Sequence, residues 1–149
     1  MNELFFPQRR LVAACASRNG NLAPLTRPPR VCILGGGFGG LCTAIRLETL
    51  TWPEGRKPEV TLIDQHDRFV FKPLMYELLG KRASQEEVAP EFPKLLAPYP
   101  TRFVQNAVKA IKPDKDGVTD CGRVELQNGD TLEYDYLVVA MGGVIDLGA

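Results

Sequence analysis

The chain has only four cysteines, a single histidine, no net charge and no long apolar run. The cysteines show no paired spacing and no accompanying histidine cluster, which argues against a zinc site, any other metal centre and a disulfide framework. A net charge of zero gives no indication of a nucleic-acid partner. No apolar run approaches the roughly 18 residues that a membrane-spanning helix needs. The 149 residues, 44% of them hydrophobic, suffice for one domain with a sizeable core.

The first 30 residues differ from the rest in charge, because they hold five arginines, one acidic residue and no lysine. An arginine-containing leader that is poor in acids is typical of organellar transit peptides, whereas a secretory signal has a longer apolar core. The alternative is an N-terminal extension without a targeting function. In both cases we expect residues 1–29 to be disordered or weakly packed, and residues 30–149 to form the domain.

A strand, a glycine loop and a helix are predicted at the start of this domain. Residues 31–34 are apolar, and Gly35, Gly37 and Gly40 follow at the G-x-G-x-x-G spacing. Gly35 permits the tight turn off the strand, and Gly37 has no Cβ to keep a pyrophosphate away from the backbone. Gly40, with Ala44 one helical turn later, lets the helix pack closely on the sheet. The first helical turn then offers its N–H groups and dipole to phosphate, which predicts dinucleotide binding.

An acidic residue ends the second predicted strand. Residues 59–64 read E-V-T-L-I-D, so the carboxylate of Asp64 follows the glycine loop at the distance typical of dinucleotide sites. Such an acid accepts hydrogen bonds from the adenosine ribose and repels a 2′-phosphate. The alternative is a solvated aspartate at a strand end. The only histidine, His66, lies in the polar turn that follows, and we expect a solvated loop residue there and not a catalytic base.

The later strands predict an α/β domain of Rossmann-like type with a parallel sheet. Residues 31–34, 60–63 and 137–140 are expected to be neighbouring parallel strands joined by a helix between the first two. The continuous apolar run at 136–140 is typical of a central strand that is buried on both faces. Residues 101–108 are expected to form one further strand.

A β-hairpin or meander insertion and short helices complete the pattern. The N-G-D turn at 128–130 lies between two strand-like segments, which is a strong hairpin signal. Residues 84–87 have the S-x-x-E form of a capping box, and the following helix is expected to be broken by the prolines at 90 and 93. Cys32 and Cys42 flank the glycine loop and are expected to pack as small apolar residues.

Four segments together resemble the N-terminal part of the type II NAD(P)H dehydrogenases. They read V-x-I-L-G-G-G-F-G-G-L, V-T-L-I-D, R-F-V-F-K-P-L-M-Y-E-L-L and L-E-Y-D-Y-L-V-V-A-M-G. The resemblance covers residues 30–143 and is closest to the plant and algal plastid branch, and the segment at 71–77 is the most particular to this family. A structural role for that segment, with Leu74 and Tyr76 packed into the core, is the alternative and is compatible with the first.

The family consists of FAD-containing NAD(P)H:quinone oxidoreductases that pump no protons. The resemblance therefore implies FAD as cofactor, NAD(P)H and a membrane quinone as partners of the full-length enzyme, and a plastid location, with the mitochondrion as alternative. It also implies which residues bind the cofactor. The pyrophosphate would be surrounded by Gly35, Gly37, Phe38, Gly39 and Gly40, and the adenosine ribose would be held by Asp64. The adenine would meet backbone groups of Ala107 and Val108, the flavin would lie near Lys72 and Pro73, and the family's Ala-Thr-Gly turn would be replaced by Ala140, Met141 and Gly142. Met141 departs from that threonine.

A full family member also has a second glycine loop, a later Gly-Asp segment over the flavin and a C-terminal amphipathic anchor for peripheral membrane association. The motifs in residues 1–149 predict none of these three features. We therefore expect an incomplete FAD-binding domain that is inactive by itself, without an assignable catalytic residue. The alternatives are a non-catalytic dinucleotide-binding module and another two-dinucleotide flavoprotein reductase. The lack of cysteine between Cys42 and Cys121 argues against the dithiol of disulfide reductases.

Overall fold

The computed structural model describes residues 27–53, 56–113 and 121–143. The leader expected at residues 1–29 lies outside these ranges except for its last three residues. The elements, in chain order, are β1 (Arg30–Leu34), α1 (Phe38–Thr49), β2 (Glu59–Asp64), the 3₁₀ helix η1 (Lys72–Leu74), α2 (Met75–Leu79), α3 (Gln85–Val88), α4 (Phe92–Leu96), β3 (Arg102–Gln105), β4 (Val108–Lys112), β5 (Gly122–Leu126), β6 (Thr131–Tyr134) and β7 (Tyr136–Val139).

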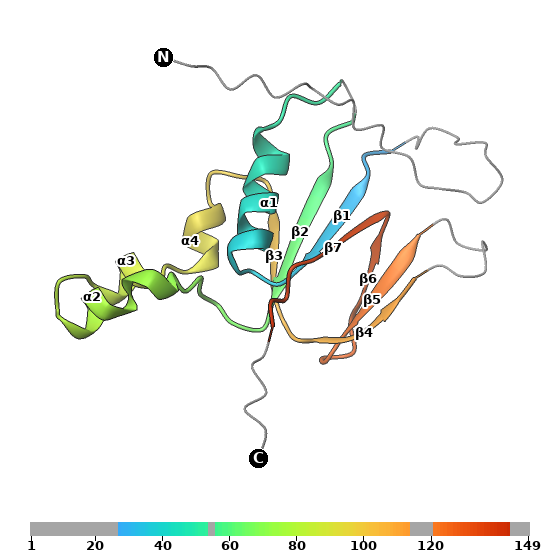
Figure 1. The fold of residues 1–149 in the computed structure, drawn as a ribbon. Helices are drawn as coiled ribbons and strands as arrows, with labels where there is room; N and C mark the ends of the chain where they lie inside the picture. Colours follow the sequence, from blue (N-terminus) through green and yellow to red (C-terminus); the bar gives the residue numbers. More distant parts are fainter. Residues whose placement is uncertain (1–26, 54–55, 114–120, 144–149) are drawn as a thin grey trace.

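Four parallel strands form the central sheet in the order β3-β2-β1-β7 (Figure 1). β1 pairs with β2 on one side and with β7 on the other, so that Ile33 lies opposite both Leu62 and Val138. The helix α1 connects β1 to β2. The predicted parallel pairing of the first, second and last strands is therefore confirmed, and with it the α/β fold class.

Successive side chains of these strands alternate between two covered faces of the sheet, as the pleat requires. One face packs on α1 and α4, and its buried cluster contains Val31, Ile33, Leu41, Ala44, Val60, Leu62, Phe92 and Leu96. The other face packs on β5 and β6, and its buried cluster contains Cys32, Leu34, Ile63, Val124, Leu126 and Tyr134. The domain consequently has three layers, with the sheet between the helices and the second sheet (Figure 1).

β7 is an edge strand of the described sheet, and the prediction of a central strand for this segment was wrong. Its first three residues are half-buried, and the fourth, Val139, is 60% exposed. The run is apolar because both faces are covered: Tyr136 and Val138 pack on the helical cluster, and Leu137 packs on the second sheet. A continuous apolar run thus follows from two covered faces and does not require a strand on each side.

The second sheet is an antiparallel meander of β4, β5 and β6. Its β5–β6 turn has Gly129 at φ +92°, which confirms the predicted hairpin. The single strand predicted at 101–108 was wrong, because β3 ends at Gln105 and Val108 begins β4 in the other sheet. The chain crosses between the sheets at Asn106 and Ala107, where the Asn106 N–H donates to the Asp64 carbonyl at 2.8 Å.

The capping box is confirmed, since Ser84 Oγ accepts from the Glu87 N–H at 3.3 Å and the Glu87 carboxylate accepts from the Ser84 N–H at 2.8 Å. The break into two short helices is also confirmed, with Pro93 in the first turn of α4. Within the described ranges, no helix combines the length and the apolar character needed to cross a bilayer.

Two packing expectations were only half right. Cys32 is buried between the two sheets, where burial raises the pKa of its thiol to about 11. Cys42 is exposed instead, because it lies on the outer face of α1. Leu74 is half-buried, whereas Tyr76 is 80% exposed, so the alternative that packed Tyr76 into the core was wrong.

Asp135, between β6 and β7, is a fully buried carboxylate that holds the start of β1. Its Oδ2 atom accepts from the Arg27 guanidinium and from the Arg30 backbone N–H, both at 2.7 Å. Burial by itself opposes ionisation of this carboxyl group. The hydrogen bonds from Arg27 and Arg30 outweigh that effect and lower the pKa of Asp135 to about 2.

We expect Asp135→Asn to lower the free energy of unfolding at neutral pH by about 3 kcal/mol, because two arginines lose their buried partner. In the unchanged protein, the lowered pKa contributes about 2 kcal/mol of stability, which is complete above about pH 4 and is lost as the pH falls to about 2. Urea unfolding followed by circular dichroism over this pH range measures both effects. Asp67→Asn, at a side chain that is 55% exposed, should change stability by less than about 0.5 kcal/mol. Equal losses for the two variants would contradict the assignment.

Candidate functional site

The carboxyl ends of the parallel strands meet at one edge of the central sheet. Gly35 follows β1, Asp64 ends β2 and Ala140 follows β7. The Gly35 N–H donates to the Ile63 carbonyl and the Ala140 N–H donates to the Leu34 carbonyl, both at 2.8 Å, so the ordered pairing continues past the strand ends. In open α/β sheets, ligands bind at this edge.

A cleft of about 280 Å³ opens there. Five residues of the expected site line it: Gly35, Asp64, Ala107, Val108 and Met141. Its other lining residues are Ile63, Gln65, His66 and Asn106. A larger cleft of about 650 Å³ lies at the amino edge of the sheet, and none of the expected site residues lines it.

Close packing within the protein explains three of the glycines in the loop. Gly35 has φ +97°, a conformation that side chains disfavour, and a Cβ there would lie 2.5 Å from the Ala140 carbonyl oxygen. A Cβ at Gly40 would overlap the carbonyl oxygen of Gly35, so α1 can rest on the end of β1 only without one. A Cβ at Gly36 would overlap the ring of Phe92. The sequence pattern did not single out Gly36.

Gly37 is different, because nothing in the described protein requires a glycine there. A Cβ at this position would have no described atom within 4 Å. Gly37 is the N-cap of α1 with φ −66°, which any residue adopts. The space in front of it adjoins the first turn of the helix, whose N–H groups have no partners within the helix. A ligand at the helix N-terminus is therefore the group for which this space would matter.

Asp64 fastens the glycine loop to the end of β2. Its Oδ2 atom accepts from the Gly36 N–H at 2.6 Å, and its Oδ1 atom accepts from the His66 N–H at 2.8 Å. The side chain is 17% exposed, and each carboxylate oxygen has further lone-pair capacity for a hydroxyl donor. The sequence predicted the acid and its place, but no pattern indicated that it also orders the loop.

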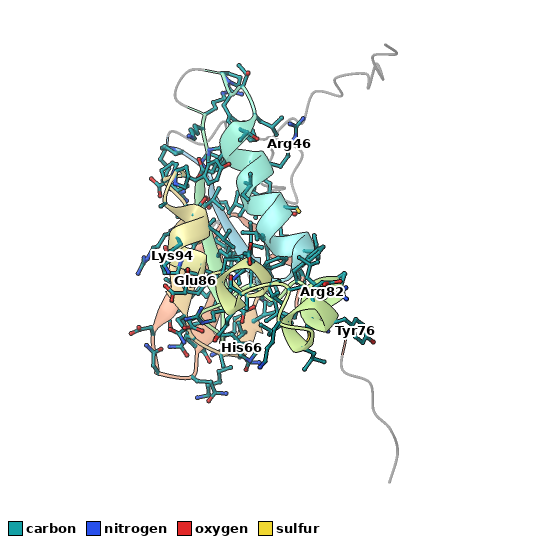
Figure 2. The ribbon with its side chains drawn as sticks, turned by 90° about the vertical axis from the view of Figure 1, so that its left-hand side faces the viewer. Arg46, His66, Tyr76, Arg82, Glu86 and Lys94 are labelled. Carbon is teal, nitrogen blue, oxygen red and sulfur yellow. The ribbon has the colours of Figure 1, made fainter. Side chains whose placement is uncertain are left out.

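His66 is an exposed turn residue, as expected. Its side chain is 71% exposed, with Nδ1 3.2 Å from Asp64 Oδ1. Figure 2 shows His66 in the lower half of the molecule, well away from Arg46, which lies in the last turn of α1. His66 is linked instead to the loop before α1, because Asp64 accepts from both the His66 N–H and the Gly36 N–H.

The ring of Phe38 packs on two other aromatic rings, a contact that the sequence did not predict. The Phe38 backbone lies in the first turn of α1, and its ring lies 5.1 Å from the ring of Phe69 and 5.3 Å from that of Phe71. Lys72 and Pro73 follow directly in η1, are exposed and do not line the cleft. The structure thus joins these two residues to the glycine loop through aromatic contacts and not through the cleft itself.

The turn after β7 borders the site beside the glycine loop and the end of β2. A Cβ at Gly39 would lie 3.7 Å from the Cβ of Ala140, which is ordinary contact. Met141 lines the cleft and is 56% exposed, and Gly142 has φ +72°. The sharp backbone of the turn explains the glycine, while the methionine side chain has no structural requirement that would exclude other residues.

Comparison with known proteins identifies the family to which this fold belongs. Residues 29–147, which are 119 of the 149 residues, match the family described as pyridine nucleotide-disulphide oxidoreductase. The chain belongs to this family. The Rossmann-like assignment and the predicted parallel sheet are thereby confirmed.

Two curated relatives bear out the resemblance to type II dehydrogenases. The chain is 50% identical over 126 residues to the alternative NAD(P)H-ubiquinone oxidoreductase C1, chloroplastic/mitochondrial, of Arabidopsis thaliana, covering 80% of this chain and 24% of the relative. It is 45% identical over 119 residues to the demethylphylloquinone reductase NdbB of Synechocystis sp., covering 77% and 28%. The chain thus spans about a quarter of the length of these relatives.

Among solved structures, the sulfide:quinone oxidoreductase of Aquifex aeolicus superposes with a TM-score of 0.66 at 31% identity, covering 81% of this chain and 26% of that one. The three-layer arrangement is therefore shared with a second kind of quinone reductase, and fold alone does not separate the two reactions.

The different reasons for the glycines predict different effects on folding. We expect Gly40→Ala to lower the free energy of unfolding by at least about 3 kcal/mol, because the new Cβ overlaps the Gly35 carbonyl and must displace α1. Gly37→Ala should change it by no more than about 1 kcal/mol, since the new Cβ meets open space at an N-cap. Urea titration of the two variants measures the difference. Comparable destabilisation would show that Gly37 is also a packing glycine.

Proposed function

We propose that this chain is the N-terminal FAD-binding part of an NAD(P)H:quinone oxidoreductase. Identities of 50% and 45% to two reductases that are named for quinones support the reaction class. Hydride would pass from NAD(P)H to FAD, and electrons would then pass to a membrane quinone. The observation that carries the cofactor assignment is Gly37, whose absent side chain serves no purpose in the described protein.

The residues present fit a dinucleotide such as FAD. The loop offers backbone N–H groups at a helix N-terminus, which suits a pyrophosphate. Asp64 offers further acceptor capacity beside the cleft, which suits the hydroxyls of a ribose. Ala107 and Val108 line the same cleft at the crossing between the two sheets, where backbone groups suit an adenine. The site therefore combines three kinds of group that match the adenosine diphosphate half of FAD.

In this proposal each part of the chain has a separate task. The pyrophosphate is bound by backbone N–H groups of Gly37, Phe38, Gly39 and Gly40 at the start of α1, and the lack of a side chain at Gly37 leaves space for it. Asp64 orients the ribose while it holds Gly36 in place. Lys72 and Pro73 lie on the flavin side, and the turn of Ala140, Met141 and Gly142 borders the cofactor opposite β2. When bound, FAD would supply the two-electron acceptor chemistry for NAD(P)H.

The cofactor proposal is tested by FAD titration of the 149-residue chain, followed by flavin fluorescence and by absorption after gel filtration. We expect Gly37→Val to raise the dissociation constant by roughly 100-fold or more, because a branched side chain would occupy the place of the pyrophosphate. Asp64→Asn should weaken binding more mildly, by about 1.5–3 kcal/mol, the usual contribution of a hydrogen bond to a charged group.

Gly80→Ala is the matched control, because a Cβ at Gly80 makes only ordinary contact, 3.5 Å from the Tyr76 carbonyl oxygen, at the end of α2. Its FAD affinity should equal that of the unchanged chain. If Gly37→Val keeps FAD and loses NAD(P)H, the loop is the nicotinamide-nucleotide site and the FAD assignment is wrong. If the unchanged chain binds neither nucleotide, the binding function fails for this chain.

We also propose a plastid location, with the mitochondrion as alternative. The acid-poor, arginine-containing leader supports it, as does the name of the Arabidopsis relative. Labelled chain incubated with isolated plastids should become protected from added protease and should be shortened. A chain that stays at full length and remains sensitive to protease would refute plastid import.

A further inference from the structure

The two parts of the proposed FAD site lie on separate segments of the chain. The glycine loop, with the first turn of α1, belongs to the β1–α1 unit. Lys72 and Pro73, the proposed flavin-side residues, belong to η1, which does not line the cleft. A long cofactor that contacts both parts binds tightly only if their relative position is fixed in advance, because any freedom between them must otherwise be lost on binding.

The segment before η1 is held firmly. The Phe69 N–H donates to the Pro90 carbonyl at 3.0 Å, and the Phe71 N–H donates to the Val88 carbonyl at 2.9 Å. Arg68 adds an ion pair of 2.8 Å to Glu91. Residues 68–71 therefore lie as an extended strip along residues 88–91, next to α3 and α4.

Beyond this strip the chain has few contacts with the rest of the domain. η1 has no buried residue, and neither has α2, whose Tyr76 and Leu79 side chains are each 80% exposed. Figure 1 shows α2 at the far end of a projection from the sheet, and Figure 2 shows the Tyr76 side chain at the margin of the molecule. η1 begins at Phe71, its N-cap residue, so its orientation depends on how Phe71 is held.

Phe38 is the side chain from the glycine loop that reaches this strip. Its ring packs edge-on against Phe69, at an interplanar angle of 82°, and is tilted against Phe71. Phe38 is nonetheless 54% exposed, so core burial is not its main role. One residue thus has its N–H in the proposed phosphate-binding turn and its ring on the residue that begins η1.

We propose that Phe38 is a positioning residue that fixes Lys72 and Pro73 relative to the pyrophosphate loop, so that the two halves of the cofactor are bound by a preorganised site. This inference rests on the proposed FAD function. It assigns the ring of Phe38 to the flavin half of the site and the backbone of Phe38 to the phosphate half.

The test compares two ligands, FAD and ADP, because ADP contains only the half held by the glycine loop and Asp64. Phe38→Ala keeps the backbone of the first helical turn and removes the ring. We expect its dissociation constant for FAD to rise roughly tenfold, in line with the loss of two aromatic contacts, while that for ADP stays within about twofold. Phe38→Tyr keeps the ring and should bind both ligands as the unchanged chain does.

A double-mutant cycle identifies the contact responsible. Phe71→Ala should weaken FAD binding as Phe38→Ala does, and the double variant should be no weaker than either single variant, because both remove the same link. Additive losses would mean that the rings act separately. An equal loss of FAD and ADP affinity in Phe38→Ala, or no loss of either, would overturn the proposal.

A ligand-free measurement separates this inference from the proposed function. Hydrogen exchange of the peptide spanning residues 69–79 should be faster in Phe38→Ala than in the unchanged chain and unchanged in Phe38→Tyr, while peptides from β1 and β2 keep their protection. If the unchanged chain binds neither FAD nor ADP, the proposed function fails, and unchanged exchange at 69–79 would independently refute the link through Phe38.

Discussion

The close approach of α1 to the end of β1 is the constraint on which the rest of the site depends. Gly40 lies directly over the carbonyl of Gly35, and no residue with a Cβ fits there. This approach lets the helix begin immediately after the strand, with its N-terminus at the edge where β2, β3 and β7 also end. The helix then covers one face of the sheet through Leu41 and Ala44, while its first turn lies directly after the glycine loop.

The sequence predicted those features that depend on neighbours along the chain. The glycine spacing, the strand ending at Asp64, the N-G-D turn and the Ser84–Glu87 cap are each local, and the structure contains all of them. Local patterns do not predict the features that tertiary contacts determine. The chain leaves one sheet after Gln105 and enters another at Val108, with no glycine or proline to mark the crossing.

The same limit applies to the candidate site. The acid at position 64 was predicted for a ligand, but its bond to the Gly36 N–H depends on the fold around it. Phe38 was expected beside a pyrophosphate, but no pattern indicated that its ring would pack on Phe69 and Phe71, which are distant in sequence. The alternative that packed Tyr76 into the core was wrong because its short helix projects from the domain and buries no residue, which the local sequence does not indicate.

In the proposed function Asp64 has two tasks, ordering the loop and binding the ribose, and together they limit how the nucleotide preference of this loop can change. A site that accepts a 2′-phosphate commonly replaces such an acid with a neutral or basic residue, since the carboxylate repels the phosphate. Here the same replacement would also release the N–H groups of Gly36 and His66 from their acceptor. A switch of preference would therefore need at least one further substitution that orders the loop again. A single substitution at position 64 would weaken nucleotide binding without creating a site for the 2′-phosphate.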